Sequence, residues 1–103
     1  MKTINEYGTI RFYNDKKQLH RDDGPAVIWP DGIQAYYQNG QLHRNDGPAV
    51  IKSNGYLAYY QNNKRHRLDG PAVIHEDGTL EFYQFGKFIK KIKQKIKSWK
   101  IGF

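Results

Sequence analysis

The chain has 103 residues and a formal net charge of +7, and its length fits a single domain with a small hydrophobic core. It contains no cysteine, which excludes disulfides and thiolate metal sites. It also has no apolar run typical of a signal peptide or a membrane span, so the sequence predicts a cytoplasmic protein. Aromatic residues make up 15% of the chain, a composition that suits a thin, half-exposed β-sheet.

The positive charge belongs to one end of the chain. Residues 1–86 contain ten Lys or Arg and ten Asp or Glu, so their formal charges cancel. Residues 87–103 contain seven Lys and no acidic residue. We therefore expect a β-repeat domain over residues 1–86 and a basic segment over residues 87–103. Any affinity for an anionic partner is then a property of the second part.

A unit of 23 residues is written three times, with partial copies at both ends. Each full copy contains His-Arg followed by Asp-Gly-Pro-Ala-Val-Ile, and pairs of aromatic residues recur at nearly the same interval. Self-similarity of this kind predicts an array of equivalent supersecondary units. The marker residues are His20, His43 and His66, then Asp23, Asp46 and Asp69, then Gly24, Gly47 and Gly70, and the aromatic pairs begin at Phe12, Tyr36, Tyr59 and Phe82.

Within one unit the pattern predicts two antiparallel strands. Residues 33–38 are rich in aromatics and bounded by glycine, which indicates a strand. Asn39-Gly40 then supplies two residues that tolerate positive φ, as a tight hairpin turn requires. The return strand begins at residues 41–43, is interrupted by a bulge or small loop at residues 46–48, because proline donates no ladder hydrogen bond, and resumes at residues 49–51.

The two ends of the array depart from the unit, as the capping units of a repeat protein do. Residues 2–13 resemble a degraded last half of a unit followed by an aromatic strand. Phe85-Gly86 stands where Asn39-Gly40 stands, and the pattern stops after it. Uncapped edge strands at such ends can pair between chains, so a homo-oligomer is one possible assembly.

The string Tyr-Tyr-Gln-Asn-Gly-Gln-Leu-His, followed by Asp-Gly-Pro-Ala-Val-Ile and an Asp-Gly or Asn-Gly turn, resembles the MORN repeat in its variant bacterial and phage form, over about residues 7–86. The chain departs from the typical motif at His-Arg-x-Asp-Gly, where MORN repeats have His-Gly-x-Gly. The resemblance implies a single-layer antiparallel sheet of hairpins. It also implies scaffolding and partner binding, with lipid-headgroup binding proposed for some members, and it implies no reaction.

The repeated histidines are the most evident candidates for chemistry, and we interpret them as structural. Two ligands of one metal ion lie about 2 Å from it, whereas histidines one unit apart start roughly 10 Å apart, because a unit contributes two strands. Each is expected to bond the backbone or the local Asp. Three near-identical copies also argue against one differentiated catalytic site. The sequence therefore predicts no enzyme, no metal and no cofactor.

Neighbouring residues of a strand point to opposite faces, so the two members of each aromatic pair are expected to separate. One member builds the packed face and the other forms an aromatic stripe. That stripe either shields a thin sheet or binds a partner, since Tyr is favoured at interfaces. Trp29 lies at a position that varies between units and is the strongest single candidate. The predicted partner-binding residues of the repeats are Trp29, Tyr36, Tyr56 and Tyr59.

The basic segment has apolar residues at helical spacing, which predicts an amphipathic α-helix over residues 88–101. Docking of this helix on the open sheet would complete the core. Alternatively it lies on an anionic membrane or contacts nucleic-acid phosphates. The residues expected to carry these contacts are Lys90, Lys91, Lys93, Lys95, Lys97, Trp99 and Lys100.

The expected fold is an all-β, single-layer antiparallel meander of seven or eight strands with one C-terminal helix, most simply docked on the sheet. The expected function is a non-enzymatic protein–protein interaction module. A small phage or mobile-element protein that binds and inhibits a host protein would suit this size and charge. The alternative is binding of anionic lipid or nucleic acid through residues 87–103.

Overall fold

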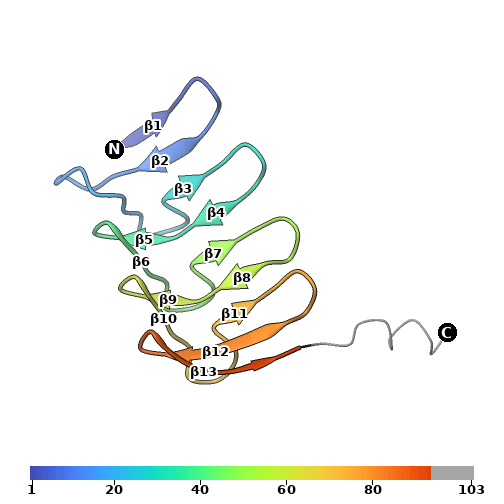
Figure 1. Cartoon of the computed structure of the whole chain (residues 1–103). Helices are drawn as coiled ribbons and strands as arrows, with labels where there is room; N and C mark the ends of the chain where they lie inside the picture. Colours follow the sequence, from blue (N-terminus) through green and yellow to red (C-terminus); the bar gives the residue numbers. More distant parts are fainter. Residues whose placement is uncertain (94–103) are drawn as a thin grey trace.

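The computed structural model describes residues 1–93, and every regular element in them is a β-strand. Nine strands form one antiparallel sheet that meanders along the chain (Figure 1). In spatial order they are β1 (Lys2–Ile4), β2 (Ile10–Phe12), β3 (Val27–Ile28), β4 (Gln34–Ala35), β7 (Val50–Ile51), β8 (Leu57–Ala58), β11 (Val73–Ile74), β12 (Leu80–Gln84) and β13 (Lys87–Ile92). Two hairpins stand beside this sheet, β5 (Tyr37–Gln38) with β6 (Gln41–Leu42) and β9 (Tyr60–Gln61) with β10 (Lys64–Arg65).

The predicted all-β antiparallel class is confirmed, but the predicted number of strands is wrong. The strand expected over residues 33–38 is broken at Tyr36, so that β4 pairs with β3 and β7 while β5 pairs only with β6. The loop between β6 and β7 causes the break, because it separates the return strand into two halves. The thirteen short strands of residues 1–93 replace the seven or eight expected.

The hairpin turns follow the prediction from residue type. Asn39 and Gly40 have φ angles of 49° and 82°, and the corresponding Asn62 and Asn63 have 49° and 67°. Positive φ at both central residues matches the right-handed twist of the flanking strands. Phe85 and Gly86 have φ angles of 52° and 83°, so the same turn recurs at the end of the array. Its first central residue is Phe, which rarely adopts a positive φ.

The predicted helix is wrong over the residues that the structure describes. Lys87–Ile92 form β13, which pairs antiparallel with β12 from Gln84↔Lys87 to Leu80↔Ile92. The turn at Phe85-Gly86 returns the chain along β12, and pairing there satisfies backbone groups that a helix would have left open at the sheet edge. This part of the basic segment therefore extends the sheet instead of docking on it. The remainder of the predicted helix, residues 94–101, lies outside the described residues.

The register divides the sheet into two faces. Directly opposed residues share a face, and the pairing places a row of aliphatic side chains across all nine strands, interrupted only by Gln34. This row is Ile4, Ile10, Ile28, Gln34, Ile51, Leu57, Ile74, Leu80 and Ile92. The opposite face carries Val27, Ala35, Val50, Ala58 and Val73, and we call it the alanine–valine face.

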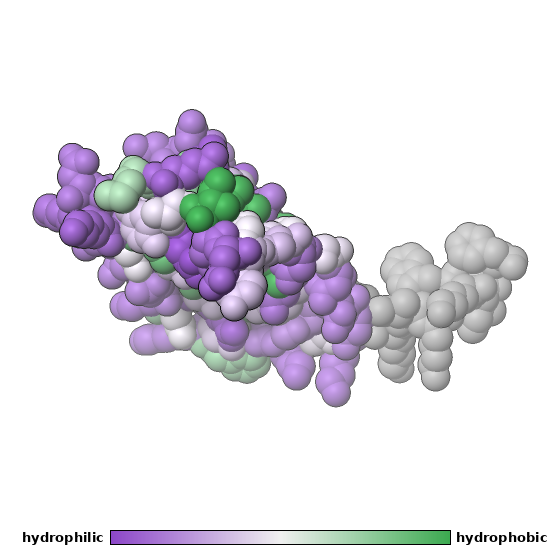
Figure 2. All heavy atoms as spheres, turned by 90° about the horizontal axis from the view of Figure 1, so that it is seen from above, coloured by the Kyte–Doolittle hydropathy of each residue, from purple (hydrophilic) through white to green (hydrophobic). Residues whose placement is uncertain are grey.

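The core is thin and made of small residues. The buried apolar side chains are Ala26, Val27, Ala35, Ala49, Ala58, Ala72 and Val73. Most larger aliphatic residues stay partly exposed, as expected of a sheet without a second layer. Seen from the β1 end, the surface is mostly hydrophilic with small hydrophobic patches (Figure 2). Within residues 1–93 there is no helix with the length and hydrophobicity needed to cross a membrane.

Candidate functional site

An arginine clamp closes the loop in each unit. The Cζ of Arg44 lies 3.9 Å from the ring centre of Tyr36, and it also lies close to Gly47, where an added Cβ would come within 2.9 Å of that Cζ. Its Nε donates to Oδ1 of Asp46 at 3.0 Å, and its Nη1 donates to the carbonyl of Pro48 at 3.1 Å. The stacking and the two hydrogen bonds explain why Arg, Asp and Gly recur together. Arg21 on Phe12 and Arg67 on Tyr59 repeat this arrangement.

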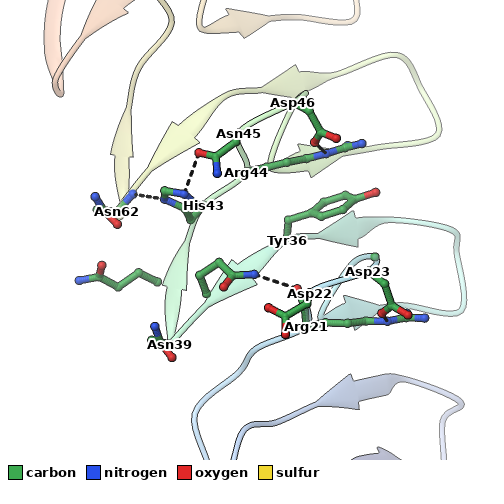
Figure 3. A pocket seen from close by; sticks show the side chains of 13 residues that line it. Arg21, Asp22, Asp23, Tyr36, Asn39, His43, Arg44, Asn45, Asp46 and Asn62 are labelled. Carbon is green, nitrogen blue, oxygen red and sulfur yellow. Dashed lines mark hydrogen bonds and ion pairs between the residues drawn. The ribbon is translucent and has the colours of Figure 1, made fainter.

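A histidine in each unit is hydrogen-bonded to the turn of the next unit. Nδ1 of His43 accepts from the backbone N–H of Asn62 at 3.2 Å, and Nδ1 of His20 accepts from Asn39 at 3.0 Å. Since Nδ1 accepts, the proton of the neutral ring is on Nε2. Nε2 of His43 accordingly donates to Oδ1 of Asn45 at 3.1 Å (Figure 3). This is the structural role predicted from the sequence, and it ties consecutive units together.

The third histidine differs in one respect. Nδ1 of His66 accepts from the backbone N–H of Phe85 at 2.9 Å, as in the other units. The position that supplies the second partner is Leu68, which has no acceptor in its side chain. Instead, the ring of His66 packs against the ring of Phe85, with 4.2 Å between ring centres.

Two open grooves lie between consecutive units on the face that carries Tyr36 and Tyr59, which we call the groove face. The first has a volume of about 720 Å³ and the second about 860 Å³. Each of the thirteen residues of the first groove has a counterpart 23 positions later in the second. The first groove, drawn in Figure 3, is lined by Arg21, Asp22, Asp23, Gly24, Tyr36, Gln38, Asn39, Gln41, His43, Arg44, Asn45, Asp46 and Asn62.

Nine of the thirteen positions carry the same residue in both grooves, and four differ. The four pairs are Asp22 and Asn45, Gln41 and Lys64, Asn45 and Leu68, and Asn62 and Phe85, and every one of these residues is exposed. The shared positions include the Arg, Asp and His of the clamps. Each groove therefore combines nine positions that are the same in both grooves, which we call the frame, with four exposed positions that differ, which we call the rim.

The rim changes the chemistry from one groove to the next. The first groove is lined by polar side chains with an excess of carboxylates, since Asp22 joins Asp23 and Asp46. The second loses that carboxylate and gains Lys64, together with Leu68 and Phe85, whose side chains are each 68% exposed. The second groove is therefore more basic and more apolar than the first.

The structure separates the predicted partner-binding residues of the repeats. Tyr36 and Tyr59 line the two grooves beneath their arginines. Tyr56, directly before β8, lies two residues from Ala58 and shares the alanine–valine face with it, and Trp29, directly after β3, shares that face with Val27. Tyr59 stacks under Arg67, whereas the hydroxyl of Tyr60 accepts a hydrogen bond from Nε of Arg65, so these neighbours have different partners. The predicted set does not form one surface.

The predicted lysines lie at the edge of the sheet. The Nζ of Lys90 is 4.8 Å from the ring centre of Phe82, Lys91 is opposite Glu81, and Lys93 is exposed. The other four predicted residues, Lys95, Lys97, Trp99 and Lys100, lie outside the described part of the chain.

The sequence pattern did not point to a polar network on the alanine–valine face. Glu81 is hydrogen-bonded to the ring of His75, and the hydroxyl of Tyr83 donates to its Oε1 at 3.0 Å. Nη1 of Arg65 donates to that hydroxyl at 3.0 Å. His75, Arg65 and Glu81 each break the repeat, because the preceding unit has Lys52, Leu42 and Ala58 there. These three departures from the repeat were the feature of the sequence that could have indicated the network.

The network shifts the ionisation of its members. The hydrogen bond to His75 is the main reason that the pKa of Glu81 is lowered, and it outweighs burial, which acts in the opposite direction. Burial opposes the charge of Arg65, but hydrogen bonds to the hydroxyls of Tyr60 and Tyr83 prevail and raise its pKa. Burial raises the pKa of Tyr56, and the charge of Arg65 offsets this only in part.

Neither face gathers a metal site in the part of the chain that the structure describes. No group of three or more His, Asp or Glu side chains of residues 1–93 is arranged to hold an ion. In the grooves, the histidine and arginine side chains are engaged by the backbone and by local carboxylate or amide groups. The arrangement is suited to binding through its exposed rim. The chain matches no protein-family model, no curated protein and no solved structure.

Proposed function

We propose that this chain is a non-enzymatic protein-interaction module of MORN-like repeats, whose two grooves bind an extended segment of a partner protein. One observation carries the proposal: the grooves share nine of thirteen lining residues and differ at four exposed ones. A constant frame with a variable rim is what recognition of an extended partner by a repeat array requires. The regular hairpin turns support the MORN-like assignment.

The spacing of the grooves suits an extended polypeptide. One unit contributes two strands of the sheet, so neighbouring grooves lie roughly 10 Å apart. An extended chain advances about 3.3 Å per residue and therefore covers that distance in about three residues. Side chains three residues apart face the same side of a polyproline II segment, which rises about 3.1 Å per residue, so such a segment crossing both grooves would place them in equivalent surroundings.

The two rims favour different partner side chains. Gln38, Asn39 and Gln41 of the first groove offer amide donors and acceptors to a peptide backbone or a polar side chain. The second groove offers the exposed surfaces of Leu68 and Phe85 beside Lys64, which favours an apolar side chain next to an acidic one. A small module bound in this way would act on its partner by covering the bound segment.

The test exchanges the rim of the second groove for residues that the array already uses there. The tagged full-length chain and the variant Leu68→Asn/Phe85→Asn are used to capture proteins from a lysate of the source cells, with quantitative mass spectrometry. Asn occupies the same positions one unit earlier, as Asn45 and Asn62, so the fold is expected to remain. We expect at least one captured protein to be reduced about tenfold, corresponding to 1.4 kcal/mol of binding free energy.

The matched control is Tyr56→Thr, on the alanine–valine face. Thr79 holds the equivalent position one unit later, so this residue is also compatible with the array. The control should retain the protein that the groove variant loses. If capture is unchanged in the groove variant, or if Tyr56→Thr abolishes it equally, the grooves are not the interaction site.

A further inference from the structure

The strand β13 is the last strand of the nine-stranded sheet, and its outer edge is unpaired within residues 1–93. It pairs with β12 on one side, and no described strand pairs with its other side (Figure 1). With six residues it is the longest strand in residues 1–93, and all six are exposed. A free edge presents a row of unpaired backbone N–H and C=O groups, which is a template for another strand.

The side chains along this edge are basic and apolar. Residues 87–93 contain Lys87, Lys90, Lys91 and Lys93 and no acidic residue. Lys90 is opposite Phe82 and Lys91 is opposite Glu81, so adjacent lysines lie on the two faces of the sheet. A strand added to this edge would thus meet positive charge on both faces.

Apolar side chains alternate with these lysines. Phe88, Ile89 and Ile92 are 57%, 50% and 41% exposed. Phe88 packs edge-on against Tyr83, with 5.5 Å between ring centres, and Ile92 continues the aliphatic row from Leu80. An added strand would therefore find apolar contacts beside each charged position.

A second copy of this chain is a poor occupant of the edge. Pairing β13 with β13 would bring lysines of both copies together, and like charges across a strand pair are destabilising. The opposite end of the sheet, β1, carries Lys2 and the amino terminus and offers only three residues. Lysines on an edge strand thus discourage self-association while leaving the edge open to a segment of opposite charge.

We infer that β13 binds an acidic, extended segment of a partner protein, which adds as a further strand to the sheet. Backbone hydrogen bonds would hold the segment, its Asp or Glu side chains would lie against Lys90 and Lys91, and its apolar residues would contact Phe88 and Ile92. This site is independent of the grooves. Phe85, which lines the second groove, lies in the turn that leads into β13.

The test uses the full chain and synthetic peptides in fluorescence anisotropy. The probe is a fluorescein-labelled (Glu-Val)4 peptide, whose glutamates share one face of a strand and meet Lys90 in one orientation and Lys91 in the other. Two further probes are the same peptide with every backbone amide N-methylated, which keeps the charges but donates no hydrogen bond, and (Lys-Val)4. We expect (Glu-Val)4 to bind at least about tenfold more tightly than either of the others, because strand addition needs both the backbone donors and the opposite charge.

Charge reversal locates the binding. The variant Lys90→Glu/Lys91→Glu should lose about tenfold in affinity for (Glu-Val)4 and gain affinity for (Lys-Val)4. Lys16→Glu/Lys17→Glu makes the same change of net charge in an exposed turn of the first unit and should leave the affinity nearly unchanged. Leu68→Asn/Phe85→Asn should also retain (Glu-Val)4, which separates this site from the grooves. Circular dichroism verifies that each variant is folded.

Three outcomes would overturn the inference. If the N-methylated peptide bound as tightly as (Glu-Val)4, charge alone would account for the affinity. An equal loss in Lys16→Glu/Lys17→Glu would show that the affinity is not located at β13. Tighter binding of phosphatidylserine vesicles or of a DNA duplex, lost in Lys90→Glu/Lys91→Glu, would identify the edge as a lipid or nucleic-acid site.

Discussion

The middle unit and the last unit have the same frame and different surfaces. In both, an arginine is stacked on an aromatic ring and a histidine holds the next turn. The middle unit keeps Asn62 and Leu42 at positions where the last unit has Phe85 and Arg65. The last unit therefore keeps the residues that close the loop and differs in residues that face solvent or a partner. Function is therefore expected to concentrate where the array ends.

The largest expected effect comes from the clamp that both units share. Arg44→Ala removes a ring contact and two hydrogen bonds, and should lower the free energy of unfolding by about 2 kcal/mol. Arg67→Ala should cost a similar amount, because its contacts are the same. Urea denaturation followed by circular dichroism measures both. A cost below about 0.5 kcal/mol would show that the clamp does not stabilise the loop.

Arg44→Lys is the matched control for charge. It keeps the positive charge but lacks the planar group that stacks on Tyr36 and donates to two partners at once. Its stability should fall between those of the native chain and Arg44→Ala. A variant as stable as the native chain would mean that charge alone accounts for the clamp.

Among residues 1–93, the network on the alanine–valine face exists only in the last unit, and Glu81→Gln should remove the negative charge of Glu81. At neutral pH the variant should be less stable by about 1–2 kcal/mol, because hydrogen bonds to a carboxylate are lost. The pKa of Glu81 is lower in the folded chain than its ordinary value. Its stabilising contribution is therefore complete above the ordinary carboxyl pKa and is lost as the pH falls through the folded value.

Denaturation at several pH values measures this difference. The gap in stability between the native chain and Glu81→Gln should close on acidification through the carboxyl range. Glu6→Gln, at an exposed residue of the first turn, should show no comparable gap. A gap that stays constant at all pH values would mean that the ionisation of Glu81 does not stabilise the fold.

The smallest expected effect concerns the turn in which the two units differ. Phe85→Asn should raise the free energy of unfolding by about 0.5 kcal/mol, because Asn tolerates positive φ better than Phe. The loss of the ring contact with His66 limits the gain. The reciprocal change Asn62→Phe should destabilise the middle turn by a similar amount. If Phe85→Asn and Asn62→Phe changed the free energy of unfolding in the same direction, the conformation of the turn would not explain the effects.

The repeat made much of the fold predictable from the sequence. Turn residues such as Asn39 and Gly40 have a narrow range of suitable conformations, so their positions predict hairpins. The histidines were predictable as structural because they recur in register with the loop. The broken strand at Tyr36 was not predictable, since it depends on a three-dimensional contact between Tyr36 and Arg44 of the loop that follows β6.

The error at residues 88–92 has a physical cause. Phe88, Ile89 and Ile92 fit one face of a helix, and helical spacing in a short apolar set does not exclude a strand. The turn at Phe85-Gly86 decided the outcome, because it places the next residues beside β12. Register also divided the candidate site. Trp29 is at a position that varies between units and Tyr36 at one that recurs, and the two residues lie on opposite faces.

The hydrogen bond from each turn to the histidine of the preceding unit has a consequence for how such a protein lengthens. His43 contacts a residue 19 positions later, in the adjacent unit, and that bond is formed anew at every junction. Duplication of one 23-residue segment would supply both partners of a new junction. Because each groove lies between two units, each duplication would also add one groove. The chain can therefore gain recognition positions by gene duplication without redesign of its core.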